Sequence, residues 1–217
     1  MQRTITKKSD PFADAVSLSP FITIAQQVGA ECFSLPQTLA HALDEREPGS
    51  PSWSVWDREL IDKVSRDNRI PTDLVASIET SGHSWIDDLL AGVFRRPDDV
   101  AIFHRVKRAV LNLARNGRVL LVGHGSVYMT RDLANGVRIR LIAPMKMRIS
   151  NVAARFNMSR DEAEQHIRSV DRQRRTFFHR YWPDWPLNDD MFTAVFNTAQ
   201  LDQEQLTRAI LELIPPG

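Results

Sequence analysis

The sequence predicts an α/β protein with three layers, in which a five-stranded parallel sheet lies between two layers of helices. Short β-type runs alternate with helical stretches along the chain, and this order is typical of βαβ units with parallel strands. The run at residues 118–122 is almost wholly apolar, as expected for a strand that is buried on both faces. Ligands of such folds bind beyond the carboxyl ends of the strands, so the segments that follow the strands are the candidate sites.

Five runs have the length and the apolar or alternating pattern of strands. They are residues 21–25, 52–56, 118–122, 137–143 and 193–197. Helices are expected between and after them, at residues 57–69, 100–116, 145–156 and 202–213. Ser159 and Glu162 form a capping box, because the serine can accept a hydrogen bond from an early amide while the glutamate reaches back. This box is expected to open a long helix that ends near Tyr181.

Residues 21–217 are expected to form one domain, since a chain of 217 residues is long enough for one sizeable core. Residues 1–20 have mixed polar character and two prolines, which predicts an N-terminal arm that is either loosely ordered or packed on a neighbour. Residues 71–98 are rich in polar residues and are expected to form a helical insertion rather than part of the sheet.

Composition argues against several classes of protein. The formal net charge is +1, so charge indicates no particular partner, and binding of nucleic acid is not expected. No apolar run approaches the roughly 18 residues that span a bilayer, so a membrane partner is not expected either. Cys32 is the one cysteine, which suits a reducing compartment, and a cytoplasmic location is expected. The chain has no CxxC or HxxxH pair, so no protein-held metal is expected.

Two short stretches stand directly after predicted strands. Asp57 and Arg58 follow the second strand, and the forked donors of an arginine match two phosphate oxygens. The alternative is an ordinary helix start with a surface arginine. Gly123 and Gly125 follow the third strand, where glycines let the backbone approach a ligand closely, although a tight turn would need them as well. A third junction, residues 143–148, brings an arginine onto the helix after the fourth strand and is common in α/β proteins.

Residues 155–180 hold seven arginines against four acidic residues, a local balance of +3 in a chain whose net charge is +1. Arginine without lysine favours the binding of oxyanions over solubility alone. Asp171 is expected to pair with Arg174 or Arg175 three or four positions along the helix. The alternative is a solvated amphipathic helix with no ligand.

The order of these motifs resembles the cytidylate-kinase-like family of P-loop nucleoside-monophosphate kinases over roughly residues 21–213. The most specific matches are DRELI at 57–61, RFNMSRDEAEQHIRSVDRQR at 155–174 and FNT at 196–198. The resemblance implies a nucleotide-binding loop after the first strand, an NMP-binding insertion and an arginine-rich lid at residues 155–182. It also implies ATP and Mg²⁺ as cofactors if the protein is active. The implied partner is a nucleotide or another phosphorylated small molecule, and a homo-oligomer is compatible with the sequence.

The resemblance also implies roles for particular residues. The implied nucleotide-binding residues are Gly29, Ala30, Ser34, Asp57, Arg58, Gly123 and Gly125. The implied catalytic residues, whose lid cations would neutralise phosphoryl charge, are Arg155, Asp171, Arg174 and Arg180.

The loop after the first strand departs from the family pattern. The family's loop is similar to SREYGSGGREIA, whereas residues 25–36 here are AQQVGAECFSLP. Phe33 stands in place of the basic residue and cannot pair with a phosphate, and Gly29 is the one family glycine that is kept. We therefore expect phosphoryl transfer from ATP to be weak or absent. The alternatives are a pseudokinase that binds a nucleotide or another phosphorylated ligand, and an interaction scaffold whose cleft is filled with Phe33 in its core.

Overall fold

The computed structural model describes residues 19–30, 32–56, 99–184 and 186–215. Three predicted segments lie outside these residues: the helix at 57–69, the insertion at 71–98 and nearly all of the N-terminal arm at 1–20. Asp57 and Arg58 lie outside them as well.

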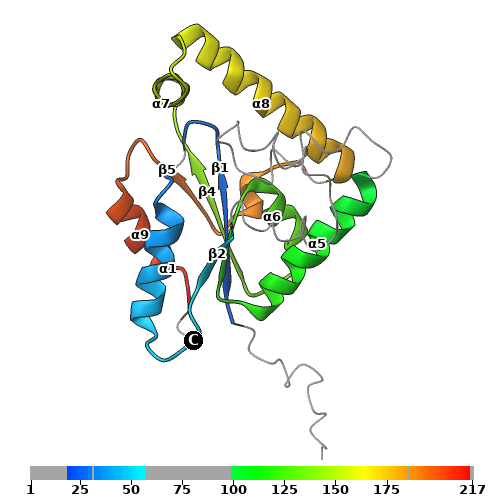
Figure 1. The fold of residues 1–217 in the computed structure, drawn as a ribbon, viewed down its shortest axis with the longest axis vertical. Helices are drawn as coiled ribbons and strands as arrows, with labels where there is room; N and C mark the ends of the chain where they lie inside the picture. Colours follow the sequence, from blue (N-terminus) through cyan, green and yellow to red (C-terminus); the bar gives the residue numbers. More distant parts are fainter. Residues whose placement is uncertain (1–18, 31, 57–98, 185, 216–217) are drawn as a thin grey trace, which may run out of the picture.

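A five-stranded parallel sheet forms the centre of the described part of the chain, as the sequence predicts (Figure 1). Its strands are β1 (Phe21–Gln26), β2 (Ser54–Trp56), β3 (Val119–Val122), β4 (Gly136–Ile142) and β5 (Ala194–Asn197). The strand order is β2-β3-β1-β4-β5, and every neighbouring pair is parallel. All five predicted strands are confirmed to within two residues at each end. Because the strands are parallel, their carboxyl ends meet at one edge of the sheet.

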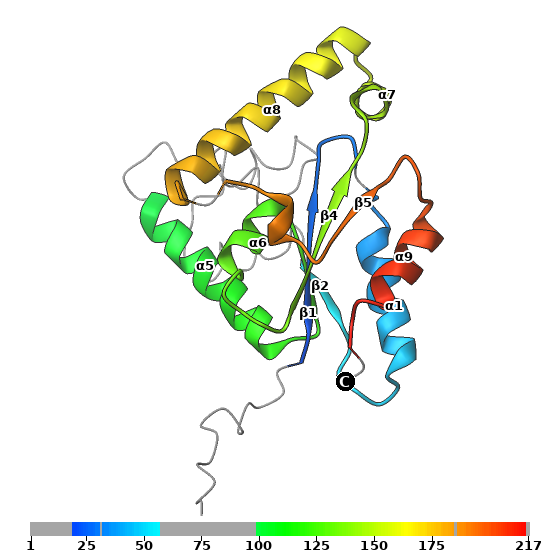
Figure 2. The same cartoon turned by 180° about the vertical axis from the view of Figure 1, so that it is seen from behind.

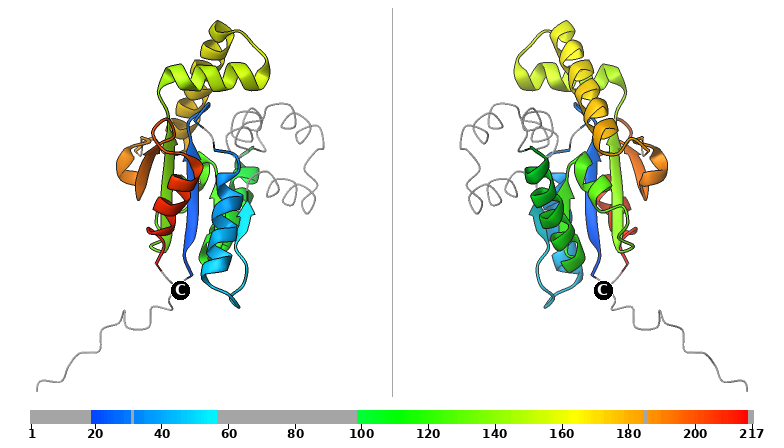
Figure 3. Two further views of the ribbon diagram at one scale, coloured as in Figure 1. Left: turned by 90° about the vertical axis from the view of Figure 1, so that its left-hand side faces the viewer. Right: turned by 90° about the vertical axis from the view of Figure 1, so that its right-hand side faces the viewer.

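Helices cover both faces of the sheet, and two more helices lie beyond its carboxyl edge (Figures 1 and 3). One face carries α1 (Leu35–Arg46) and α9 (Gln203–Leu211), and the other carries α5 (Asp99–Asn116) and α6 (His124–Met129). Beyond the edge lie α7 (Met145–Phe156) and α8 (Arg160–Tyr181), the second of which runs back over the α5–α6 side (Figure 2). A 3₁₀ turn, η1 (Asp189–Met191), precedes β5.

The strands divide their apolar side chains between two cores. Ile22 and Ile24 of β1 pack on one face with Leu39 of α1 and Ile210 of α9. Phe21, on the other face, belongs to a cluster with aromatic residues of α8 and the residue after it. These aromatic residues are Phe177, Phe178 and Trp182. Since α8 contributes to this second core, its carboxyl half is anchored on the sheet while its amino half extends beyond the edge.

The predicted long helix starts as its capping box requires. The Ser159 side chain accepts a hydrogen bond from the Glu162 amide, and the Glu162 carboxylate accepts one from the Ser159 amide at 2.8 Å. The Ser159 hydroxyl also donates to the Glu162 carboxylate at 2.7 Å, and this bond together with the one from the Ser159 amide lowers the pKa of Glu162. The preceding helix α7 ends at Asn157, whose φ of 50° turns the chain, so α7 and α8 form a corner.

A third apolar cluster joins this corner to the loop after β1. Val28 of the loop packs with Ile149 and Val152 of α7 and with Ala163 and Ile167 of α8. The loop is therefore attached to the two helices beyond the edge as well as to the sheet. Among the described residues, no helix has both the length and the apolar character that crossing a membrane requires.

Candidate functional site

The loop that follows β1 closes as a β-turn. The Ala30 amide donates to the Gln27 carbonyl oxygen at 2.9 Å, and Gly29 has a φ of 82°, as a type II turn requires at this position. A Cβ at Gly29 would lie 2.6 Å from the Arg148 carbonyl oxygen. Glycine is therefore needed here for its backbone conformation and for the close approach of α7. The turn places Ala30 in the interior, where its amide is already bonded.

Side chains of α7 and α8 cover the carbonyl groups of this turn. Arg148 donates through Nε to the Val28 carbonyl at 2.7 Å, and Asn151 donates through Nδ2 to the Gly29 carbonyl at 2.8 Å. Arg174 donates through Nη1 to the Gln26 carbonyl at 3.3 Å. Arg148 and Arg174 are both buried. These hydrogen bonds fix α7 and α8 onto the loop.

Asp171 pairs across the corner rather than along its own helix. Its Oδ2 lies 2.8 Å from Nη2 of Arg148 on α7. The prediction of a partner at Arg174 or Arg175 is wrong within the described residues, where Arg148 is the guanidinium that pairs with Asp171. Helical spacing favours a local pair, but the corner brings a buried guanidinium from another helix closer.

Phe33 is exposed, not part of the core. Its exposed fraction is 59%, and the Arg155 guanidinium carbon lies 4.2 Å from the centre of its ring. Arg155 also lies 5.2 Å from the ring centre of Phe156. These three side chains line a cavity of about 350 Å³ between the loop and α7, together with Val28, Gly29, Asn151 and Val152. The expectation of a cleft filled by a buried Phe33 is therefore wrong, because the ring lies at the surface and stacks on an arginine.

Ser34 stands at the N-cap position of α1, but its hydroxyl makes no capping bond. The hydroxyl donates instead to Oε1 of Gln203 on α9, and Nε2 of Gln203 donates to Thr38 Oγ1 at 2.9 Å. The only hydroxyl between Ala30 and Leu35 therefore belongs to a contact between α1 and α9.

Gly123 and Gly125 belong to the start of a short buried helix, α6, and not to an isolated tight turn. Gly123 has a φ of 132° and caps α6, and its amide donates to the Ile24 carbonyl of β1 at 2.8 Å. Gly125 lies inside α6, where every residue is buried. The pair lets α6 start directly at the sheet edge, and this start places His124 beside the end of β1.

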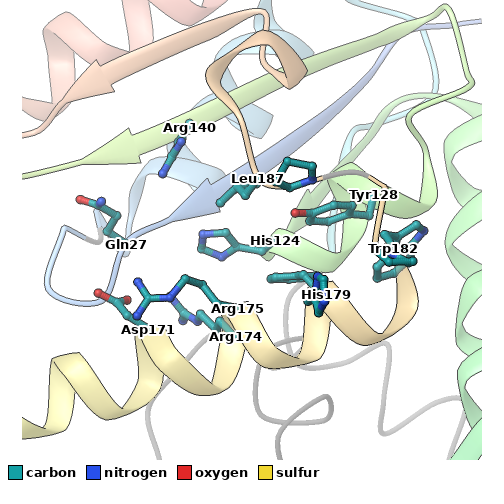
Figure 4. Close-up of a pocket in the computed structure, with 13 residues that line it drawn as sticks. Gln27, His124, Tyr128, Arg140, Asp171, Arg174, Arg175, His179, Trp182 and Leu187 are labelled. Carbon is teal, nitrogen blue, oxygen red and sulfur yellow. The ribbon is translucent and has the colours of Figure 1, made fainter.

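A second cavity, of about 410 Å³, lies between α8, α6 and β4 (Figure 4). Its lining contains several cationic or titratable side chains and a group of aromatic ones. The residues that line it are Gln27, His124, Tyr128, Arg140, Asp171, Arg174, Arg175, Phe178, His179, Trp182, Pro183, Pro186 and Leu187. Guanidinium groups beside rings and apolar side chains suit a ligand with an anionic group and an apolar body.

The implied site residues are divided among these features. Asp171 and Arg174 lie together in the wall of the 410 Å³ cavity, whereas Arg155 lines the smaller one beside Gly29. Arg180 is exposed near the end of α8, with its guanidinium carbon 5.7 Å from the Tyr181 ring centre. It lines neither of these two cavities.

Sequence reasoning missed Arg140 and Tyr128 as cavity residues. Arg140 had a signal, because strand alternation places it and Arg138 on the same face of a strand that a parallel sheet normally fills with apolar side chains. Tyr128 had none, since α6 was not predicted. Within the described ranges, no group of three or more histidine, cysteine or acidic side chains could hold a metal ion.

The fold and the loop define the general class of the protein. A parallel sheet in the order β2-β3-β1-β4-β5, with a loop and a helix after its central strand, is the fold of the P-loop kinases. The chain belongs to the cytidylate kinase-like family, whose pattern it matches over residues 21–200. The predicted resemblance is thereby confirmed.

Individual relatives are distant. A curated cytidylate kinase from Ignicoccus hospitalis is 28% identical over 116 residues, which cover 54% of this chain and 67% of that protein. Among solved structures, an uncharacterized protein from Eubacterium ventriosum aligns with a TM-score of 0.59 at 16% identity, covering 90% of this chain and 98% of that one. A shikimate kinase from Acinetobacter baumannii, solved with shikimate, aligns with a TM-score of 0.47 at 16% identity over 90% and 92% of the two chains. The first of these structures supports the fold alone.

Proposed function

We propose that this protein binds a phosphorylated small molecule in the 410 Å³ cavity beneath α8, with a nucleoside monophosphate as the first candidate, and transfers phosphate from ATP weakly or not at all. The observation that carries the proposal is the contrast between the cavity beneath α8 and the loop after β1. The cavity has three guanidinium groups in its lining, whereas the loop after β1 is closed as a turn with its carbonyls covered.

The donor side of the site argues against an ATP–Mg²⁺ complex. A phosphate loop presents consecutive amides, a cation and a hydroxyl for the metal. Here the Ala30 amide is bonded to Gln27, Phe33 stands in the cation's place and the Ser34 hydroxyl donates to Gln203. The described residues of the loop therefore do not fit an ATP–Mg²⁺ complex.

The acceptor side of the site supports binding. Arg174 and Arg175 of α8 line a cavity that is also lined by the rings of Phe178 and Trp182. A guanidinium forms paired, charge-assisted hydrogen bonds with phosphate oxygens. The Asp171 carboxylate in the same lining pairs with Arg148 on α7.

The test is a calorimetric binding screen with CMP, UMP, AMP, GMP and ATP–Mg²⁺. We expect at least one monophosphate to bind with micromolar affinity and ATP–Mg²⁺ to bind at least about a hundredfold more weakly, equivalent to about 2.7 kcal/mol. Arg174→Met should abolish monophosphate binding, whereas Arg168→Met, an exposed arginine on the same helix, should leave it unchanged. The nucleoside monophosphate is excluded as the ligand if none of the four binds, and the proposal fails if ATP–Mg²⁺ binds as tightly as the tightest phosphorylated ligand.

Family membership favours a second function, an active nucleoside-monophosphate kinase. In that case another subunit or another part of the chain must supply the cation that Phe33 does not. Incubation of concentrated protein with ATP, Mg²⁺ and each monophosphate distinguishes the two functions. Nucleoside diphosphate above a heat-inactivated control, abolished by Arg174→Met, would establish the kinase.

A further inference from the structure

The guanidinium groups of the 410 Å³ cavity lie on two opposite walls. Arg174 and Arg175 come from α8, whereas Arg140 comes from β4 on the sheet side (Figure 4). His124 lies between the two walls in the same view. A ligand whose one phosphate binds at α8 would therefore place no anionic group at Arg140.

Arg140 is held in place but keeps donors to spare. Its Nη1 lies 2.5 Å from Oδ1 of Asp189, and its guanidinium carbon lies 5.5 Å from the ring centre of Phe192. Its Nε is shielded from solvent and has no hydrogen-bond partner among the described residues. Since a guanidinium has five N–H donors, the pair with Asp189 orients the group without using it up.

Tyr128 of α6 places a second unused donor in the lining of the same cavity. Its ring stacks on both Phe178 and Trp182, with ring centroids 4.5 Å and 4.8 Å away, and these contacts fix the direction of its hydroxyl. The hydroxyl is buried and has no hydrogen-bond partner among the described residues, and its oxygen points toward His124 and Leu187 (Figure 4). Burial raises the pKa of Tyr128 to about 12, although the charge of Arg140 opposes this rise. The hydroxyl therefore stays protonated at neutral pH and can donate a hydrogen bond.

Buried donors without partners cost free energy unless a ligand or water satisfies them. An oxyanion near the sheet-side wall would accept from Arg140 and from Tyr128 together. A neutral carbonyl oxygen would satisfy the hydroxyl but would gain less from a guanidinium. The wall therefore favours a carboxylate over a neutral group.

We propose that the cavity binds a small phosphorylated acid, with its phosphate on Arg174 and Arg175 of α8 and its carboxylate on Arg140 of β4 and Tyr128 of α6. This inference rests on the proposed function, because it takes the phosphate subsite from it. It adds the second anionic group and the two residues that select for that group.

The test compares two matched probes, 3-phosphoglycerate and glycerol 3-phosphate, which share a phosphate and a three-carbon chain and differ in one carboxylate. Calorimetry on the full chain should show 3-phosphoglycerate binding at least about tenfold more tightly than glycerol 3-phosphate. Arg140→Met should abolish that difference while leaving the affinity for glycerol 3-phosphate within about threefold. Asp189 is 70% exposed, so the loss of its partner is compensated by water and the variant should fold. Arg168→Met, outside the cavity, is the matched control.

Tyr128→Phe is the second variant, and it separates a ligand donor from a structural one. It should weaken 3-phosphoglycerate about threefold to tenfold while the melting temperature of the ligand-free protein stays equal or rises, because an unpaired hydroxyl has been removed. A lower melting temperature without ligand would overturn the role of the hydroxyl. Equal affinities for the two probes on the unmodified chain, or binding of a nucleoside monophosphate but of neither probe, would overturn this inference alone. Failure of both probes and of every monophosphate would overturn the proposed function with it.

Discussion

Arg148→Met should be among the most destabilising single changes in the described part of the chain. The Arg148 side chain is 6% exposed, and it holds both the Val28 carbonyl and the Asp171 carboxylate. Removing it leaves a buried carbonyl without a donor, which costs about 1–3 kcal/mol. The carboxylate costs less, about 1 kcal/mol, because Asp171 is 26% exposed and water can reach it. We therefore expect the free energy of unfolding to fall by about 3 kcal/mol.

Urea unfolding followed by tryptophan fluorescence measures this loss, since the chain has five tryptophans. Arg168→Met is the control, because Arg168 makes an exposed pair with Glu164 that contributes no more than about 0.5 kcal/mol. In a double-mutant cycle, Asp171→Asn combined with Arg148→Met should show a coupling of about 1 kcal/mol. A loss below about 1 kcal/mol for Arg148→Met would refute the view that α7 holds the loop through this side chain.

Three further predictions concern the loop and the cavity. Gly29→Ala should cost about 2–4 kcal/mol in urea unfolding, because a Cβ would meet the Arg148 backbone at a positive φ. Gly49→Ala, also at a positive φ but with nothing within 4 Å, should cost only about 1 kcal/mol, and equal losses would contradict the role of close approach. Phe33→Lys should change the affinity for ATP–Mg²⁺ by no more than about threefold in calorimetry, because the closed turn rather than one missing cation blocks the site. A hundredfold gain in affinity would show that the missing cation is what prevents ATP from binding. Because the pKa of Tyr128 is raised on folding, its contribution to the free energy of unfolding is present below pH 10 and is lost as the pH rises toward 12. Between these pH values the unmodified chain should lose on the order of 2 kcal/mol more of this free energy than Tyr128→Phe. Parallel plots of unfolding free energy against pH for the two proteins would contradict this prediction.

The elements that could be predicted are those with local signals. Strands of a parallel sheet are apolar on both faces, so a short run of consecutive apolar residues such as Val119–Val122 predicts a strand directly. The capping box at Ser159 and Glu162 marks the start of α8 for the same reason, since both partners lie within one helical turn.

The helix α6 could not be predicted, because its stability is not local. It has six residues, starts at a glycine with a φ of 132° and contains a second glycine at 125. Such a sequence has poor helix propensity, and isolated helices of this length are not stable in water. All six residues are buried, and the helix packs on β1 and α5 and, through Tyr128, on Phe178 of α8, so packing rather than propensity forms it.

The bond between Arg148 and the loop could not be predicted either, because it also depends on a contact that is distant in the sequence. Its partner on the loop is a backbone carbonyl 120 positions earlier in the chain, and carbonyl groups carry no sequence signal. An arginine after a strand and a proline looks like an ordinary surface residue until the corner between α7 and α8 is built. The position of the phosphate-type loop could be predicted from the order of motifs, but the side chains that cover it could not.

These long-range contacts bear on how the protein works. A kinase lid has to separate from the phosphate loop before ATP can enter. Separation here would break the bonds from Arg148, Asn151 and Arg174 to the turn and expose Val28, at a cost of about 5 kcal/mol. An open state at that free energy is populated in about one molecule in 5,000, and the apparent affinity for ATP falls by the same factor. A ligand of the cavity beneath α8 needs no such separation, because the cavity lies between α8 and the sheet with the loop contacts intact. The contacts of the buried Arg148 and Arg174 therefore support the proposal of binding without efficient turnover, as Phe33 in place of the basic residue does.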